Sequence, residues 1–272
     1  MSVKIRNNVT LAGDGPATVV FAHGFGCDQN MWRYVEPAFR TRYRTVLFDL
    51  VGCGRSDLSA YDVQKYSSLD GYAHDIIEII ERFGEGPVLF VGHSVSSMAG
   101  VLASNRRSGL IDAHIMIGPS PCYINDDSYC GGFSAQDIDS LLETLESNYL
   151  GWSSAMAPVI MGAPEHPEYA AELTNSFCKT DPDIAKRFAR VTFLSDLRKD
   201  VARLREPTLV VQSSEDFIAP MEVGQYLVQV IPEAHLAVVE NVGHCPHLSA
   251  PEACIEAMSG FLAGLGRPFD VQ

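Results

Sequence analysis

Three residues that together could activate a nucleophile occur far apart in the chain, each just after a short apolar run. They are Ser94, Asp216 and His244, and the runs before them are PVLFVG, TLVVQS and HLAVVE. A serine hydroxyl is a weak nucleophile, so it needs a base within hydrogen-bond reach and an acid that orients the base. Because the carboxyl ends of parallel strands meet at one edge of a sheet, we expect Ser94 as nucleophile, His244 as base and Asp216 as orienting acid to lie together.

Each of these assignments has a competitor in the sequence. Ser94 could simply cap the helix that follows it, since serine is a preferred N-cap residue. Glu215 adjoins Asp216, but we favour Asp216 because it lies one position farther beyond the apolar run. His247 is the alternative to His244, and we favour His244 because the glycine before it permits a tight turn that directs the side chain back toward the sheet.

The stretch HGFG at 23–26 could complete the chemistry, because acyl transfer needs hydrogen-bond donors for a developing oxyanion. When the nucleophile sits on a strand-to-helix turn, one donor is the backbone N–H of the next residue, here Val95, and the other comes from the loop after an earlier strand. We assign the second donor to Phe25, whose flanking glycines let the backbone approach a substrate. The alternative is that HGFG is only a flexible turn. His23 and His93 flank the site, and we expect them to be hydrogen-bonded structural histidines.

Six near-continuously apolar runs indicate the strands that would position these residues. This pattern is typical of strands buried on both faces of a parallel sheet. Helical patterns fall between several of the runs, so the alternation predicts an α/β fold with a mostly parallel, doubly wound sheet. The runs are residues 18–23, 44–50, 87–92, 113–118, 208–213 and 235–240.

The alternation stops between about 121 and 205, where four helical patterns replace the strands. Ser134 is the expected N-cap of the first helix, and the last begins with proline in its first turn. We therefore expect a core formed by residues 1–120 and 206–272, with a helical lid at 121–205. An insertion at the carboxyl ends of the strands is placed to cover a pocket.

The pocket under such a lid should be mainly apolar, with one polar cluster. A cavity of this kind suits a small hydrophobic ester or lactone. Trp152 and Met156 stand at helical i, i+4 spacing, so the alternative is that they belong only to the core of the lid. The expected pocket residues are Phe25, Phe133, Trp152, Met156, Phe193 and Ile218.

The charge and the cysteine content of the chain bear on its binding partners and its cellular compartment. A formal net charge of −14 disfavours nucleic acid and anionic membranes as binding partners. Seven cysteines without a C-x-x-C pair predict buried thiols in a reducing compartment, and the scattered histidines predict neither a metal nor another cofactor. The N-terminal residues lack the apolar core of a signal peptide, and the uncharged stretch 87–105 is better explained by strand–turn–helix than by a membrane span. We expect a cytoplasmic protein.

Several motifs together resemble the α/β-hydrolase superfamily, namely HGFG, DLVGCGRSD, GHSVS, DFIAP and GHCPH, in the chain order Ser, Asp, His. Further stretches, GCDQNMW, YSSLDGYAHDI and GPSPCYIND, resemble one branch over about residues 3–265. That branch comprises the RsbQ-type bacterial stress-regulator hydrolases and their plant relatives, the strigolactone and karrikin receptors. Ser96 stands where the general motif G-x-S-x-G has its last glycine, and this branch tolerates serine or glycine there.

The resemblance implies a serine hydrolase coupled to signalling, as an RsbQ-like positive regulator of a stress response that acts on a partner phosphatase. Two alternatives are a general metabolic carboxylesterase and a non-hydrolytic small-molecule sensor on the same scaffold. A lyase or a cofactor-free haloperoxidase is a further alternative, since a fold does not determine a function. Dehalogenase and epoxide-hydrolase chemistry is disfavoured, because those enzymes place an aspartate where Ser94 stands.

Overall fold

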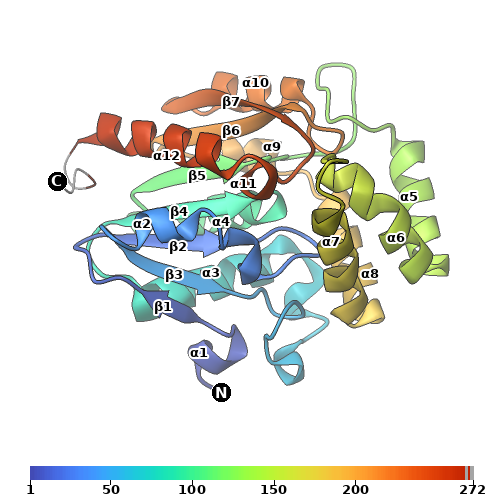
Figure 1. The fold of residues 1–272 in the computed structure, drawn as a ribbon, viewed down its shortest axis with the longest axis horizontal. Coiled ribbons are helices and arrows are strands. Elements are labelled where there is room, and N and C mark those ends of the chain that lie inside the picture. Colours follow the sequence, from blue (N-terminus) through green and yellow to red (C-terminus); the bar gives the residue numbers. More distant parts are fainter. Residues whose placement is uncertain (267–268, 270–272) are drawn as a thin grey trace.

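A seven-stranded sheet with helices on both faces forms the centre of the computed structural model, which describes residues 1–266 and 269 (Figure 1). The strand order is β1-β3-β2-β4-β5-β6-β7, and only β1 pairs antiparallel to its neighbour. The predicted α/β architecture with a mostly parallel, doubly wound sheet is confirmed. The strands are β1 (Thr10–Ala12), β2 (Thr18–Ala22), β3 (Arg44–Phe48), β4 (Val88–His93), β5 (Ala113–Ile117), β6 (Thr208–Glu215) and β7 (Ala234–Val242).

The central strands are buried on both faces, which explains their continuous apolar runs. Every residue of β2, β4 and β5 is buried. The parallel register sets Ala22 beside Gly92, and His93 beside Ile117. The carboxyl ends of these three strands therefore reach the same edge of the sheet.

Helices cover the two faces of the sheet. One face is covered by α3 (Leu69–Phe83), α4 (Val95–Arg106) and α10 (Met221–Val230). The other is covered by α12 (Pro251–Leu265) and by the segment with η1 (Gln29–Trp32) and α2 (Glu36–Phe39). The shorter elements are α1 (Val3–Arg6), η2 (Leu58–Ala60), η3 (Lys65–Ser67), α9 (Arg198–Val201) and α11 (Pro246–Ser249).

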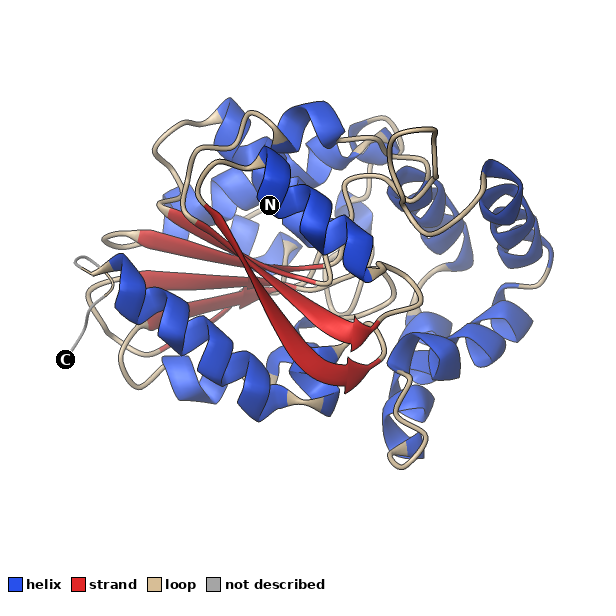
Figure 2. Cartoon of the chain, turned by 90° about the horizontal axis from the view of Figure 1, so that it is seen from above, coloured by secondary structure: helices blue, strands red, loops and turns tan. Residues whose placement is uncertain are grey.

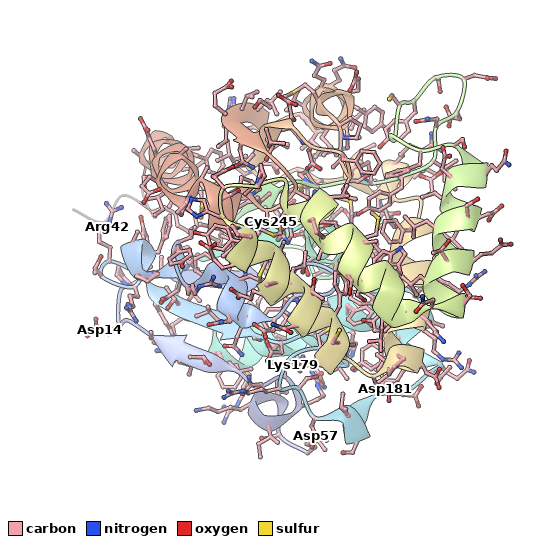
Figure 3. All side chains as sticks on the ribbon, turned by 45° about the vertical axis from the view of Figure 1, so that its right-hand side comes forward. Asp14, Arg42, Asp57, Lys179, Asp181 and Cys245 are labelled. Carbon is pink, nitrogen blue, oxygen red and sulfur yellow. The ribbon has the colours of Figure 1, made fainter. Side chains whose placement is uncertain are left out.

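Four long helices, followed by the short α9, lie between β5 and β6 in the sequence, and the four form a separate group beyond the carboxyl ends of the strands (Figure 2). Ser134 caps the first of them in a reciprocal capping box with Asp137, as its sequence predicted. Lys179 and Asp181 mark the turn between the last two (Figure 3). The helices are α5 (Ala135–Ser147), α6 (Tyr149–Met161), α7 (Pro167–Lys179) and α8 (Pro182–Phe193).

Two features bear on the environment of the chain. All seven cysteines are free thiols, and five are buried, but Cys130 and Cys178 are exposed, which corrects the expectation that every thiol is buried. In residues 1–266 and 269, no helix combines the length and the apolar character needed to cross a membrane.

Candidate active site

A continuous relay of hydrogen bonds joins Ser94, His244 and Asp216. The Ser94 hydroxyl donates to His244 Nε2 across 2.8 Å, and His244 Nδ1–H donates to Asp216 Oδ2 across 2.7 Å. A carboxylate can only accept, which places the imidazole proton on Nδ1 and leaves Nε2 free as the base. Each residue is at most 8% exposed. The structure thus brings the three predicted residues together beyond the ends of β4, β7 and β6.

The backbone at Ser94 adopts a conformation that residues with a β-carbon rarely adopt. Its φ is +54° and its ψ is −124°, between the end of β4 and the start of α4. Such a conformation costs on the order of 1–3 kcal/mol and persists only where the surroundings hold it. Here the Ser94 N–H donates to Ile117 O across 2.8 Å, and its hydroxyl makes no capping bond to α4. The side chain is directed to His244 instead of capping the helix.

Backbone donors orient the carboxylate of Asp216. The N–H groups of Ile218 and Ala219 donate to Oδ1 across 2.8 and 3.1 Å, which leaves Oδ2 for His244. Glu215, the competing acid, is exposed at the end of β6. The structure therefore selects Asp216 as the partner of the imidazole.

The imidazole of His247, the competitor of His244, makes no hydrogen bond within the described part of the chain. Its ring lies near those of Trp32 and His93, with centroid distances of 4.6 and 4.4 Å, and burial lowers its pKa to about 3. Burial also lowers the pKa of His93, whose Nε2–H donates to His244 O across 3.0 Å. His93 is thus a neutral structural histidine, as expected, and it supports the backbone of His244.

The loop that carries His244 is docked by backbone contacts against the end of α6. The His244 N–H donates to Ile160 O across 2.7 Å. Gly243 has a φ of +114°, and a β-carbon there would lie 2.0 Å from Met161 O. At Gly162, with a φ of +60°, a β-carbon would lie 2.7 Å from the last carbonyl of β7. The inserted helices therefore contact the histidine loop directly.

The HGFG loop lies against the nucleophile. A β-carbon at Gly24 would lie 3.2 Å from Ser94 Cβ and 2.5 Å from His93 Nδ1, so this approach requires glycine. Phe25 follows and lines the cavity beside Ser94. The backbone N–H groups of Phe25 and Val95 remain the predicted donors for an oxyanion beside Ser94.

A narrow cavity of about 30 Å³ opens onto Ser94 and His244. That volume is room for about two water molecules. Phe133 is not part of its wall, because its ring packs edge-on against Phe217 with centroids 5.7 Å apart, which corrects the expectation for this residue. The other predicted pocket residues all line the cavity: Phe25, Trp152, Met156, Phe193 and Ile218.

The ring of Phe25 is enclosed by aromatic side chains of the inserted helices. The centroid distances are 6.2 Å to Trp152, 5.5 Å to Phe177, 5.5 Å to Phe188 and 6.1 Å to Phe193. Trp152 therefore belongs both to the packing of these helices and to the wall of the cavity. Trp152 and Phe193, which line the cavity, thus also contact the loop that is predicted to donate to the oxyanion.

Several polar wall residues were missed by sequence reasoning. The hydroxyl of Thr192 is buried without a hydrogen-bond partner in the described residues, the buried hydroxyl of Tyr123 lies near that of Ser94, and burial raises the pKa of Tyr123 to about 12. Cys27 and Cys245 also line the cavity, and burial raises the pKa of both thiols, which makes them unreactive (Cys245 is labelled in Figure 3). Tyr123 lies six positions beyond the end of β5, so the strand-end rule that located the nucleophile does not single it out. Thr192, on α8, carries no such signal either.

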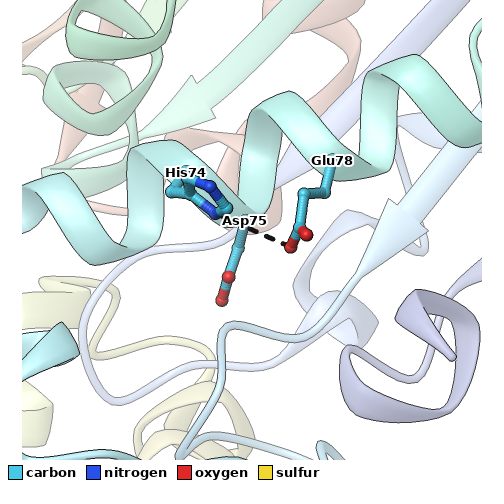
Figure 4. A group of neighbouring side chains, drawn as sticks. All are labelled: His74, Asp75 and Glu78. Atoms are coloured by element: carbon cyan, nitrogen blue, oxygen red, sulfur yellow. Dashed lines mark ion pairs between the residues drawn. The ribbon is translucent and has the colours of Figure 1, made fainter. Parts of the chain in front are cut away.

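One cluster of potential metal ligands, His74, Asp75 and Glu78, occurs in the described residues (Figure 4). Asp75 Oδ1 pairs with Lys65 across 2.5 Å and with Arg6 across 3.1 Å. Glu78 pairs with Arg6 across 2.5 Å and lies 3.7 Å from His74 Nδ1. Because both carboxylates already have cationic partners, we interpret the cluster as an ion-pair network that ties α1 to α3.

Comparison with known proteins extends over nearly the whole chain. Residues 19–257 match the model of the alpha/beta hydrolase family. The chain is 38% identical over 257 residues to karrikin insensitive 2 receptor CA of Petunia hybrida, and the alignment covers 94% of this chain and 95% of that protein. It is 37% identical over 245 residues to strigolactone esterase D14 of Arabidopsis thaliana, covering 90% and 91% of the two chains. Among solved structures, a hydrolase from Oleispira antarctica matches with a TM-score of 0.91 at 41% identity over 96% of each chain.

Proposed function

The chain belongs to the alpha/beta hydrolase family, as its motifs indicated, and we propose that it cleaves a small hydrophobic ester or lactone with Ser94 as nucleophile. The observation that carries this proposal is the buried relay from Ser94 through His244 to Asp216, with hydrogen bonds of 2.8 and 2.7 Å. It supplies the base and the orienting acid that a serine hydroxyl needs. The relative from Arabidopsis thaliana is named an esterase, which supports the substrate class.

The proposed reaction is acyl transfer in two steps. His244 Nε2 takes the proton of Ser94 as Oγ attacks the carbonyl carbon, and the N–H groups of Phe25 and Val95 bind the oxyanion. The imidazolium then protonates the departing alkoxide, which leaves an acyl group on Ser94. Water, deprotonated by His244, attacks this acyl group, and the acid leaves as the serine recovers its proton. Asp216 holds the imidazole tautomer and stabilises its charged form in both steps.

The helical group determines which substrates can enter. We assign residues 121–205 to a lid and residues 1–120 with 206–266 to the core, because α6 and α8 supply walls of the cavity; residues 267–268 and 270–272 of the predicted core lie outside the described part of the chain. A cavity of about 30 Å³ is far below the ~300–1,000 Å³ of ordinary ligand pockets. Side chains of the lid must therefore move before a substrate enters. Met156 is the most adaptable of them, since methionine is unbranched.

A second function, perception of a small molecule, is favoured by one specific observation. The chain is 38% identical over most of its length to a protein named as a karrikin receptor. A lid that must open for a ligand could report its presence to another protein. The phosphatase partner and the stress response that the RsbQ resemblance implied gain no support from the relatives described above. Slow turnover with a large shift in melting temperature on ligand binding would favour perception over metabolism.

The test is hydrolysis of p-nitrophenyl acetate by the wild type and by Ser94→Ala, with intact mass recorded during turnover. We expect the variant to lose turnover and the wild type to carry an acetyl adduct on Ser94, because the hydroxyl is the attacking group. Circular dichroism serves as the control for folding. Equal turnover in both proteins, with no adduct, would overturn the proposal.

A further inference from the structure

The two predicted oxyanion donors come from distant segments of the chain. The Val95 N–H belongs to the first turn of α4, and the Phe25 N–H belongs to the loop after β2. A tetrahedral oxyanion needs both donors about 2.7–3.1 Å from one point, so their separation must be held within a few tenths of an ångström. Some contact between the two segments has to set this separation.

Beyond the pairing of β2 with β4, the side chain of Ser96 makes one such contact. Its hydroxyl donates to the backbone carbonyl of His23 across 2.5 Å, and both residues are at most 1% exposed. Ser96 directly follows Val95, and His23 stands two positions before Phe25. The bond therefore links the two donor segments next to the donors themselves, without touching the nucleophile.

The other hydrogen bonds of this loop do not provide the same link. His23 Nδ1–H donates to Gly24 O across 2.9 Å, and Cys27 N–H donates to the same carbonyl across 3.3 Å, so both bonds are internal to the loop. His23 Nε2 accepts from Leu50 N–H across 3.0 Å, which ties the loop toward the end of β3. The bond from Ser96 is the one among these that reaches α4.

We propose that Ser96 is a positioning residue whose hydroxyl sets the Phe25 N–H relative to the Val95 N–H. The proposal rests on the proposed hydrolase function. The general motif has glycine at this position, so a smaller residue fits the turn, but it leaves the His23 carbonyl without this donor. A misplacement of about 1 Å in an active site costs roughly 100-fold in rate, and complete loss of one donor roughly 100- to 1,000-fold. Loss of the support should fall below complete loss, at about 10- to 100-fold.

The matched variants are Ser96→Ala, Ser96→Gly and Ser97→Ala. Ser97 is also fully buried on α4, and its hydroxyl donates to Gly92 O across 2.8 Å, within the same strand–helix unit. It therefore controls for loss of a buried serine hydroxyl that does not reach the loop. The readouts are kcat and KM for p-nitrophenyl acetate, inhibition by phenylboronic acid, and the melting temperature. A boronate forms a tetrahedral anion on the serine, so its affinity reports the oxyanion donors without turnover.

Both Ser96 variants should lose about 10- to 100-fold in kcat and a similar factor in boronate affinity. Their KM should stay within about threefold of the wild-type value, because the support acts only on the tetrahedral state. Ser97→Ala should stay within about threefold in kcat, whatever its melting temperature. Unchanged kcat and boronate affinity in folded Ser96 variants would overturn this inference while an inactive Ser94→Ala still supports the hydrolase. An equal loss in Ser97→Ala would also overturn it, and an inert wild type without a serine adduct would overturn both proposals.

Discussion

Buried histidines should lower the stability of this fold in mild acid. Burial lowers the pKa of His114 and of His247 to about 3, and it also lowers the pKa of His93. In the unfolded chain each ring takes up a proton near pH 6.5, whereas in the folded chain it stays neutral far below that pH. The unfolded state therefore binds more protons below pH 6.5, so stability is complete above that pH and is lost as the pH falls toward 3.

The magnitude follows from linkage. Between pH 7.5 and 5.5, each such ring lowers the free energy of unfolding by about 1 kcal/mol, or roughly 3–4 kcal/mol for the three together. His114 is the cleanest one to remove, because it lies in β5 with Ser104 as its hydrogen-bond partner and takes no part in the relay. His114→Gln should therefore lose about 1 kcal/mol less than the wild type over this interval.

The assay is urea unfolding followed by circular dichroism at pH 7.5 and at pH 5.5. The quantity of interest is the difference between the two pH values, so any loss of packing in the variant cancels. His235→Gln is the matched control, since that side chain is exposed in β7 and solvated in both states. If the wild type and His114→Gln lose the same free energy on acidification, then burial does not suppress protonation of His114 and the reasoning is wrong.

Two further predictions concern the relay and its docking to the lid. Asp216→Asn should lower kcat for p-nitrophenyl acetate by up to about 10,000-fold with little change in melting temperature, because an amide no longer enforces the productive tautomer of His244. A loss in kcat below tenfold would contradict the role of Asp216 as the orienting acid. Gly162→Ala should lower kcat at least about tenfold, because the new β-carbon would lie 2.7 Å from the backbone of Val242 and push the end of α6 away from the histidine loop. Gly260→Ala, where nothing lies within 4 Å, is its control, and equal activity of the two variants would refute the docking.

The sheet and the positions of the relay residues were predictable because each strand, and the residue that follows it, is marked by a local pattern in the sequence. Near-continuous apolar runs marked the strands, and Ser94, Asp216 and His244 each follow one such run, although β7, before His244, is mostly exposed or half-buried and not buried on two faces as expected. Since the ends of parallel strands converge, three distant positions could be placed at one edge without knowledge of the packing. The strand β1 was missed because three partly exposed residues at the edge of a sheet form too short a pattern.

Side-chain direction in the inserted segment was not predictable in the same way. Gly132 has a φ of +104° and packs beside Pro220, and this turn carries Phe133 toward Phe217 instead of the cavity. The neighbouring sequence does not predict this turn, apart from the glycine itself. The hydroxyl of Thr192 reaches the cavity only because of how α8 packs, which is a tertiary fact.

Phe25 connects the proposed chemistry to the lid. Its N–H is predicted to bind the oxyanion, whereas its ring is enclosed by four aromatic rings of α6, α7 and α8. The cavity of about 30 Å³ is too small for an ester, so side chains of the proposed lid must move to admit one. Trp152 and Phe193 both line the cavity and contact Phe25. If these two side chains move, they must return before the N–H of Phe25 is in place. Under the proposed function, each turnover then includes an opening and a closing of these side chains, which predicts that their position depends on whether a ligand is bound.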